Sequence, residues 1–276
     1  MLLENIKPSP ALADFISCYR IAEFVFSSEE TPPYKAYPPR PQECLQFFPR
    51  DLESVSYNHT VDFKVKSGCV ITGQHTQVNY RHIGKNFLTV LVVFKPGMLY
   101  RLTGVPASEL INHYFDAKDI LQKEIVLINE QLHDAVSYKE MLVIIEKYLL
   151  TLVNRSKQQT HIVSEIAQQM LDAENKAPID YFMKEACLCR RQFDRKFREW
   201  MGINPKLYGR IARFDQAFRM KNRYVYKDWL TIAVHCGYYD YQHLSKEYKD
   251  FTGLTPNDFL SLETKAPERF FGDVEM

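Results

Sequence analysis

The sequence predicts an α+β protein: a β-rich, barrel-like N-terminal domain with helices, then an all-α domain with two helix-turn-helix units joined by a long helix. Three observations predict this fold. Short β-branched and aromatic runs fill residues 1 to about 120, helical periodicity follows them, and one C-terminal segment occurs twice, 51 residues apart. The predicted organisation is one domain over 1–154, a linker over 155–160 and a second domain over 161–276.

Short strands are predicted in the N-terminal part. Residues 43–49 and 69–73 have the length and composition of strands. Residues 87–94 form a nearly continuous β-branched and aromatic run, which is typical of a strand buried on both faces. Because turn sequences with Pro or Gly separate these runs, the pattern indicates a barrel or a sandwich.

Residues 137–154 are predicted to form an amphipathic helix. Its apolar stripe allows two interpretations: the helix pairs two chains into a homodimer, or it packs on its own domain. Residues 155–160 are polar and without periodicity, which indicates a linker. The stripe consists of Met141, Ile144, Ile145, Tyr148, Leu149 and Leu152.

The repeated C-terminal segment predicts two short helices with equivalent apolar stripes. Spacings of four and three place the apolar residues on one face, so the opposite polar face is left free. A Gly that can end the helix and a Pro that can begin the next follow at identical offsets. The matched pairs are Phe193 and Leu244, Phe197 and Tyr248, Trp200 and Phe251, and Ile203 and Leu254.

A shorter helix and a tight turn precede each repeated helix, at 179–189 and at 230–240, where Asp240 is a suitable N-cap. This is the helix-turn-helix plan, in which the second helix enters the major groove of DNA. The residues between the units, 205–224, read as one helix of roughly 30 Å. Successive major grooves repeat about every 34 Å, so the two units suit two successive grooves of double-stranded DNA.

The charge distribution points to the same partner. The net charge is only +1, but residues 184–227 hold 13 Lys and Arg against 4 Asp and Glu, whereas residues 228–276 hold 4 against 9. A concentrated basic stretch is expected of a phosphate-binding surface. Arginine suits guanine and phosphate, and glutamine suits adenine. The candidate DNA-binding residues are Arg190, Arg191, Asp194, Arg195 and Arg198 on the first helix, and Tyr241, Gln242, His243 and Lys246 on the second.

Other classes of protein are disfavoured by what the sequence lacks. It shows no secretory signal and no apolar run long enough for a membrane span, which favours the cytoplasm, and its scattered cysteines suit free thiols. No phosphate loop, nucleophile elbow or paired-carboxylate pattern is present, so we predict neither an enzyme nor a cofactor. His59, His75 and His82 fit no metal-ligand spacing, nor do Cys187 and Cys189, so no metal site is predicted.

At this point the C-terminal residues resemble a known family. Residues 160–262 are similar to the twin helix-turn-helix domain of AraC/XylS-type bacterial transcription regulators, chiefly through 232–233, 237–238, 240–248, Gly253 and 256–259. The first unit matches through Phe193, Arg195, Phe197, Gly202, Pro205 and Tyr208. The resemblance implies that Arg191, Asp194, Arg195, Gln242, His243 and Lys246 contact bases and backbone.

Three features depart from the family pattern. Phe182 stands where a small Ala is usual, and Cys189 replaces the usual Ser N-cap, which costs about 1 kcal/mol of helix-start stability. The second unit, residues 228–260, has a net charge of −3, so it should hold phosphate weakly.

The N-terminal part resembles the effector-type domain that often precedes this module, through 94–97 and 102–107. That resemblance implies a cupin-like domain that binds a small-molecule effector and controls the DNA-binding domain through the linker. The residues that contact the effector stay unassigned, with Phe47 and Tyr80 as examples of candidates. The predicted function is therefore a ligand-responsive, sequence-specific regulator of bacterial transcription, with RNA polymerase as a further partner. The alternative is an RNA-binding or protein-interaction module without effector control, which the helix-core spacing of the aromatics disfavours.

Overall fold

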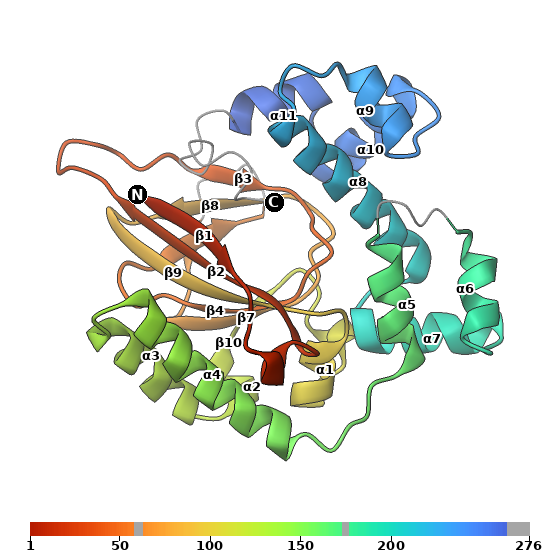
Figure 1. The fold of residues 1–276 in the computed structure, drawn as a ribbon. Helices are drawn as coiled ribbons and strands as arrows, with labels where there is room; N and C mark the ends of the chain where they lie inside the picture. The colour runs from red at the N-terminus through yellow and green to blue at the C-terminus, as the bar shows by residue number, and fades with distance from the viewer. Residues whose placement is uncertain (58–62, 173–176, 264–276) are drawn as a thin grey trace.

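The computed structural model describes residues 1–57, 63–172 and 177–263. The N-terminal part of the chain forms two antiparallel sheets, and the C-terminal helices pack along one side of them (Figure 1). The larger sheet has the order β1-β2-β9-β4-β7-β10 and the smaller one the order β3-β8-β5-β6. The strands are β1 Leu2–Ile6, β2 Ile16–Val25, β3 Lys35–Tyr37, β4 Cys44–Phe47, β5 Glu53–Ser56, β6 Lys64–Val65, β7 Cys69–Thr72, β8 Asn79–Ile83, β9 Asn86–Phe94 and β10 Tyr114–Asp116.

The predicted strands are confirmed at the centre of the larger sheet. β4, β7 and β9 correspond to the runs at 43–49, 69–73 and 87–94, and β9 is a central strand between β2 and β4. It is buried on both faces because helices pack on one face of the larger sheet and residues of the smaller sheet pack on the other. Alternation along these strands sends one set of side chains to each face. Tyr19 and Ile21 of β2 join the core under the helices, whereas Ala22 and Phe24 face the smaller sheet.

Helices cover the outer face of the larger sheet, where α3 and α4 cross it (Figure 1). The stripe of α4 is buried against this sheet: Met141, Ile145 and Leu149 are at most 4% exposed. The stripe therefore packs on its own domain, which is the second of the two interpretations, and it is not a free surface for a second chain. The N-terminal helices are the 3₁₀ turns η1 Pro10–Leu12 and η2 Ala107–Glu109, with α1 Met98–Thr103, α2 Ala117–Leu121, α3 Glu124–Asp134 and α4 Tyr138–Arg155.

No regular element lies between the end of α4 at Arg155 and the start of α5 at Ile162. This segment is nevertheless fixed to the N-terminal part by Arg101, whose Nε donates to the Gln158 carbonyl (3.0 Å) and whose Nη1 donates to Thr160 Oγ1 (2.8 Å). Ser156 Oγ donates to the Arg101 carbonyl at 2.7 Å. The segment is thus a tethered connection between the two parts of the chain.

The C-terminal part is all-α and contains both predicted helix-turn-helix units, so the predicted fold class is confirmed. The apolar stripes form its core: Phe193, Phe197, Leu244 and Tyr248 are at most 1% exposed. Trp200 and Phe251 are buried with them, as their helical spacing predicts. The helices are α5 Ile162–Met170, α6 Ile179–Glu185, α7 Arg190–Met201, α8 Pro205–Arg223, α9 Trp229–His235, α10 Tyr241–Thr252 and α11 Pro256–Glu263.

The two parts share a buried interface that touches the C-terminal ends of both α7 and α10. Near the end of α7, Tyr100 donates a hydrogen bond to Glu199 (2.7 Å) and packs its ring on Trp200 (4.9 Å between centroids). At the end of α10, the Val78 N–H donates to the Phe251 carbonyl at 2.9 Å. At the opposite ends of these helices, Arg190, Arg191, Gln242 and His243 are exposed.

Candidate nucleic-acid interface

The first candidate surface is the polar face of α7. The buried stripe fixes the helix orientation, and the four arginines Arg190, Arg191, Arg195 and Arg198 are exposed on the other side, while Asp194 is half-buried. The helix start lacks the usual Ser, but Gln192 Oε1 accepts a hydrogen bond from the Cys189 N–H at 3.3 Å. This contact satisfies one donor at the helix start.

The arginines of α7 differ in whether they form ion pairs with acidic side chains of the protein itself. Arg190 lies 3.7 Å from Asp180 and 3.6 Å from Asp194, so acids of the same unit partly neutralise its charge. Within the described part of the chain, Arg191, Arg195 and Arg198 form no ion pair. Three guanidinium groups are thus exposed with their donors available, which is the arrangement that phosphate or base edges require.

The second candidate surface is the start of α10. Asp240 caps this helix, since its Oδ1 accepts from the His243 N–H at 2.7 Å, which confirms the predicted N-cap. Gln242, His243 and Lys246 are exposed, whereas Tyr241 is half-buried and packs on the core. The His243 ring lies edge-on to Tyr238 at 5.2 Å. Tyr241 therefore packs on the core while part of it stays exposed, and the other three side chains are accessible to a ligand.

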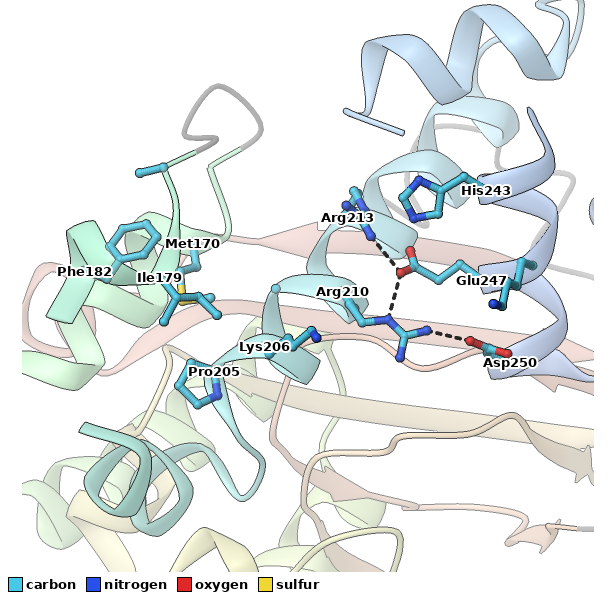
Figure 2. A pocket seen from close by; sticks show the side chains of 13 residues that line it. Met170, Ile179, Phe182, Pro205, Lys206, Arg210, Arg213, His243, Glu247 and Asp250 are labelled. Carbon is cyan, nitrogen blue, oxygen red and sulfur yellow. Dashed lines mark hydrogen bonds and ion pairs between the residues drawn. The ribbon is translucent and has the colours of Figure 1, made fainter. Parts of the chain in front are cut away.

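An open cleft of about 580 Å³ separates the two units, with α8 as its floor (Figure 2). Glu247 of α10 is 3% exposed and accepts hydrogen bonds from Arg210 Nε (2.9 Å) and Arg213 Nη2 (2.8 Å) of α8. Tyr238 Oη donates to the same carboxylate, and Arg210 also reaches Asp250 at 2.7 Å. These contacts fix α10 on α8 and neutralise two cations of the basic stretch.

The sequence analysis missed the residues that line this cleft, including Lys206, Arg210 and Glu247. A signal was present. Glu247 lies three residues after Leu244 and four before Phe251, which places it on the buried stripe. An acid at such a position needs a cationic partner, and arginines three residues apart on the neighbouring helix supply it. Phe182, the departure from the family pattern, is buried in the first unit and also lines this cleft.

Alternative chemistry has little support in the described residues. Among them, no group of His, Cys, Asp or Glu side chains has the arrangement of a metal site. His75 is buried and His82 is exposed, while His59 lies outside the described residues. Cys187 and Cys189 are exposed free thiols. Of the helices that the structure describes, none combines the length and apolar character needed to cross a membrane.

Comparisons with known proteins agree with this geometry. Residues 182–261 match the family profile of a helix-turn-helix domain, and residues 4–116 match a domain of unknown function, DUF6597. The HTH-type transcriptional regulator ArgR of Pseudomonas aeruginosa is 28% identical over 91 residues, which are 32% of this chain and 27% of ArgR. The matched segment thus spans about a quarter of that relative.

Two solved structures are also similar. ToxT of Vibrio cholerae has a TM-score of 0.48 at 9% identity, over 89% of this chain and 99% of ToxT. The AraC-like transcriptional activator CuxR has a TM-score of 0.28 at 14% identity, over 72% of this chain and 77% of CuxR.

The twin units and the matched profile define the class of the C-terminal part: residues 182–261 form a helix-turn-helix domain. The C-terminal domain is thus similar to a segment of the HTH-type transcriptional regulator ArgR.

Proposed function

We propose that this chain is a sequence-specific, cytoplasmic regulator of bacterial transcription that places α7 and α10 in two successive major grooves of duplex DNA. The observation that carries the proposal is the pair of exposed polar helix faces, one in each of the two units that α8 joins. Its 19 residues span about 28 Å, close to the repeat of about 34 Å between major grooves on one side of DNA. Because one chain carries both α7 and α10, this mode of DNA binding needs no second chain.

Within this proposal, the first unit supplies most of the affinity. Arg191, Arg195 and Arg198 offer unpaired charge, whereas the second unit offers Gln242, His243 and Lys246 in acidic surroundings. Asp194 and Arg190 hold each other and orient the start of the arginine face. Arg195 is the central residue because it lies mid-helix on the exposed face, where recognition helices approach base edges.

Binding selection on random duplex DNA tests the proposal, with gel-shift competition by RNA of the same length. We expect an enriched motif and stronger competition by duplex DNA than by RNA. Arg195→Ala should weaken binding by about 1–3 kcal/mol, and Lys246→Ala by less. Lys147→Ala, on the exposed side of α4, is the matched control and should change nothing. Selection that enriches no motif at any salt concentration contradicts the proposal.

We further propose that the N-terminal domain senses a small-molecule effector and that the occupied state changes DNA affinity and contact with RNA polymerase. The shared interface supports this, because both recognition helices end on the N-terminal domain. An effector shifts DNA affinity only by the difference between its affinities for two domain arrangements. Control would therefore act through this interface as well as through the tethered segment at 155–160.

A further inference from the structure

A polar cavity lies between the two sheets. It consists of two adjoining pockets of about 30 and 50 Å³, bounded by strands of both sheets and by the loop after β3. Such volumes hold a few water molecules or a ligand of a few heavy atoms. Both pockets share six lining residues: Tyr37, Arg40, Gln42, Gln46, Arg81 and Leu91.

The described lining of this cavity carries more positive than negative charge. Arg20, Arg40 and Arg81 line it, and Glu53 is the acid among the described lining residues. Glu53 is itself occupied, because it pairs with buried Lys66 and lies 3.9 Å from Arg81. Placing cations in a protein interior costs several kcal/mol per ion unless anions compensate them. The cavity therefore favours an anionic guest.

Two buried side chains at the cavity hold hydrogen-bonding atoms that nothing in the described structure satisfies. These atoms are Thr72 Oγ1 and both ring nitrogens of His75, and the two residues are 8% and 7% exposed. Burial, with the nearby cations Arg81 and Lys66, lowers the pKa of His75 to about 3, so its ring is neutral with one donor and one acceptor. Since buried polar atoms in proteins are nearly always paired, these atoms point to a bound polar molecule.

We propose that this cavity is the effector site and that it takes a small carboxylate of two to four carbons. The carboxylate would lie between the guanidinium groups of Arg40 and Arg81, with the Thr72 hydroxyl and the His75 N–H as further donors. Guanidinium groups bind carboxylates through paired hydrogen bonds, and the small volume excludes longer chains. This inference rests on the proposed ligand-responsive function and names the chemical class of its ligand.

Arg40 also links the cavity to the DNA-binding part. Its Nε lies 3.6 Å from Asp215 of α8, with both side chains at most 6% exposed, and its guanidinium packs over the Phe218 ring. Asp215 is shared with Arg219, at 2.8 Å. A carboxylate in the cavity would compete with Asp215 for Arg40 and weaken the contact that the N-terminal domain makes with α8. Because α8 joins both units, occupancy would change how they are held.

The test of the site uses the purified full chain and measures melting temperature and calorimetric binding with acetate, propionate and butyrate. Acetamide and propionamide are the neutral controls, and inorganic phosphate and chloride separate carboxylate recognition from general anion binding. We expect carboxylates alone to raise the melting temperature. Equal binding of amides overturns the role of charge, and equal binding of phosphate overturns the ligand class. Absence of any carboxylate binding below ~10 mM, with DNA binding intact, overturns the inference and leaves the regulator proposal standing.

Two near-isosteric variants separate a ligand site from incidental packing. Thr72→Val and His75→Phe remove the unpaired atoms but keep shape and, for His75, the ring contacts with Tyr57 and Tyr114. We expect the unliganded variants to melt at or above the temperature of the parent, with carboxylate affinity reduced at least tenfold. Thr151→Val, on α4, is the control. Unchanged affinity in both variants overturns the assignment of the site.

Asp215→Asn tests the connection through Arg40. We expect this variant to bind the carboxylate at least as tightly as the parent, while the ligand no longer changes its DNA affinity. If the ligand changes DNA affinity equally in the variant and the parent, Arg40 and Asp215 do not carry the signal. A chain that binds neither duplex DNA nor carboxylate would instead contradict the proposed function itself.

Discussion

Replacing Glu247 by Gln should destabilise the second helix-turn-helix unit by about 2–3 kcal/mol. The carboxylate is almost fully buried and accepts hydrogen bonds from Arg210 and Arg213 (Figure 2). It also accepts one from Tyr238. The amide keeps the shape but removes the negative charge, and its NH₂ group then faces a guanidinium. Breaking a buried ion pair from one side typically costs 3–5 kcal/mol. Because the two arginines are about one-third exposed, water recovers part of this energy, which sets the lower figure.

Urea unfolding followed by the fluorescence of Trp229 measures this cost, since Trp229 packs on Tyr248 of α10 at 5.4 Å between ring centroids. A Trp200→Phe background removes the second tryptophan. The expected shift of the midpoint is about 1 M urea for a loss of 2–3 kcal/mol.

The matched control for this measurement is Asp250→Asn, which removes the other acid bonded to Arg210. Asp250 is 47% exposed, so its loss should cost under about 1 kcal/mol. If Glu247→Gln unfolds within about 0.5 kcal/mol of the parent, or if Asp250→Asn costs as much, burial does not set the strength of these contacts.

Three further changes test other parts of the fold. Burial raises the pKa of Glu43 to about 8, so between about pH 4.5 and 8 this carboxyl is protonated in the folded state but ionised in the unfolded state. The free energy of unfolding should therefore fall with rising pH across this window, by up to ~1.4 kcal/mol per pH unit. Urea unfolding measured at several pH values should show this slope in the parent and not in Glu43→Gln. Gly97→Ala should cost about 1–3 kcal/mol and make residues 155–160 easier to cleave by protease, because Gly97 has φ +75° and a Cβ would lie 2.5 Å from Ser164 and 2.8 Å from Trp200. Asp240→Ala should cost about 1 kcal/mol and lower DNA affinity in a gel-shift titration; an unchanged melting temperature would remove the capping argument.

Helical periodicity in the sequence predicted the C-terminal fold well, because apolar residues such as Phe193 and Leu244 recur at helical spacing and so mark the buried face of each helix. The same kind of pattern left α4 open to two interpretations. A stripe shows which face of a helix is apolar, but it does not show whether the covering surface belongs to the same chain. The structure supplies that surface as the outer face of the larger sheet.

The polar cavity between the sheets and the domain interface could not be predicted in this way. In β8, the polar residues Asn79 and Arg81 line the cavity inside the domain, whereas Tyr80 points to the apolar cluster shared with the C-terminal part. This is the reverse of the usual strand pattern, in which apolar side chains face the inside of the domain and polar side chains face the solvent. Phe47, another candidate lining residue, is buried in the core under the helices. The bond between Val78 and Phe251 joins backbone atoms far apart in the chain, so no side-chain pattern encodes it.

The backbone bond at the end of α10 and the Tyr100 contact near the end of α7 have a consequence for the choice of operators. A free twin-unit fragment could adjust the angle between its readers and accept sites whose half-sites differ by a base pair in separation. In the intact chain, α7 contacts α1 through Tyr100 and α10 contacts the segment before β8 through Val78, so such an adjustment would break one of these contacts. The N-terminal domain would therefore fix the separation and angle of α7 and α10. The intact protein should tolerate fewer half-site separations in its operators than its own C-terminal fragment.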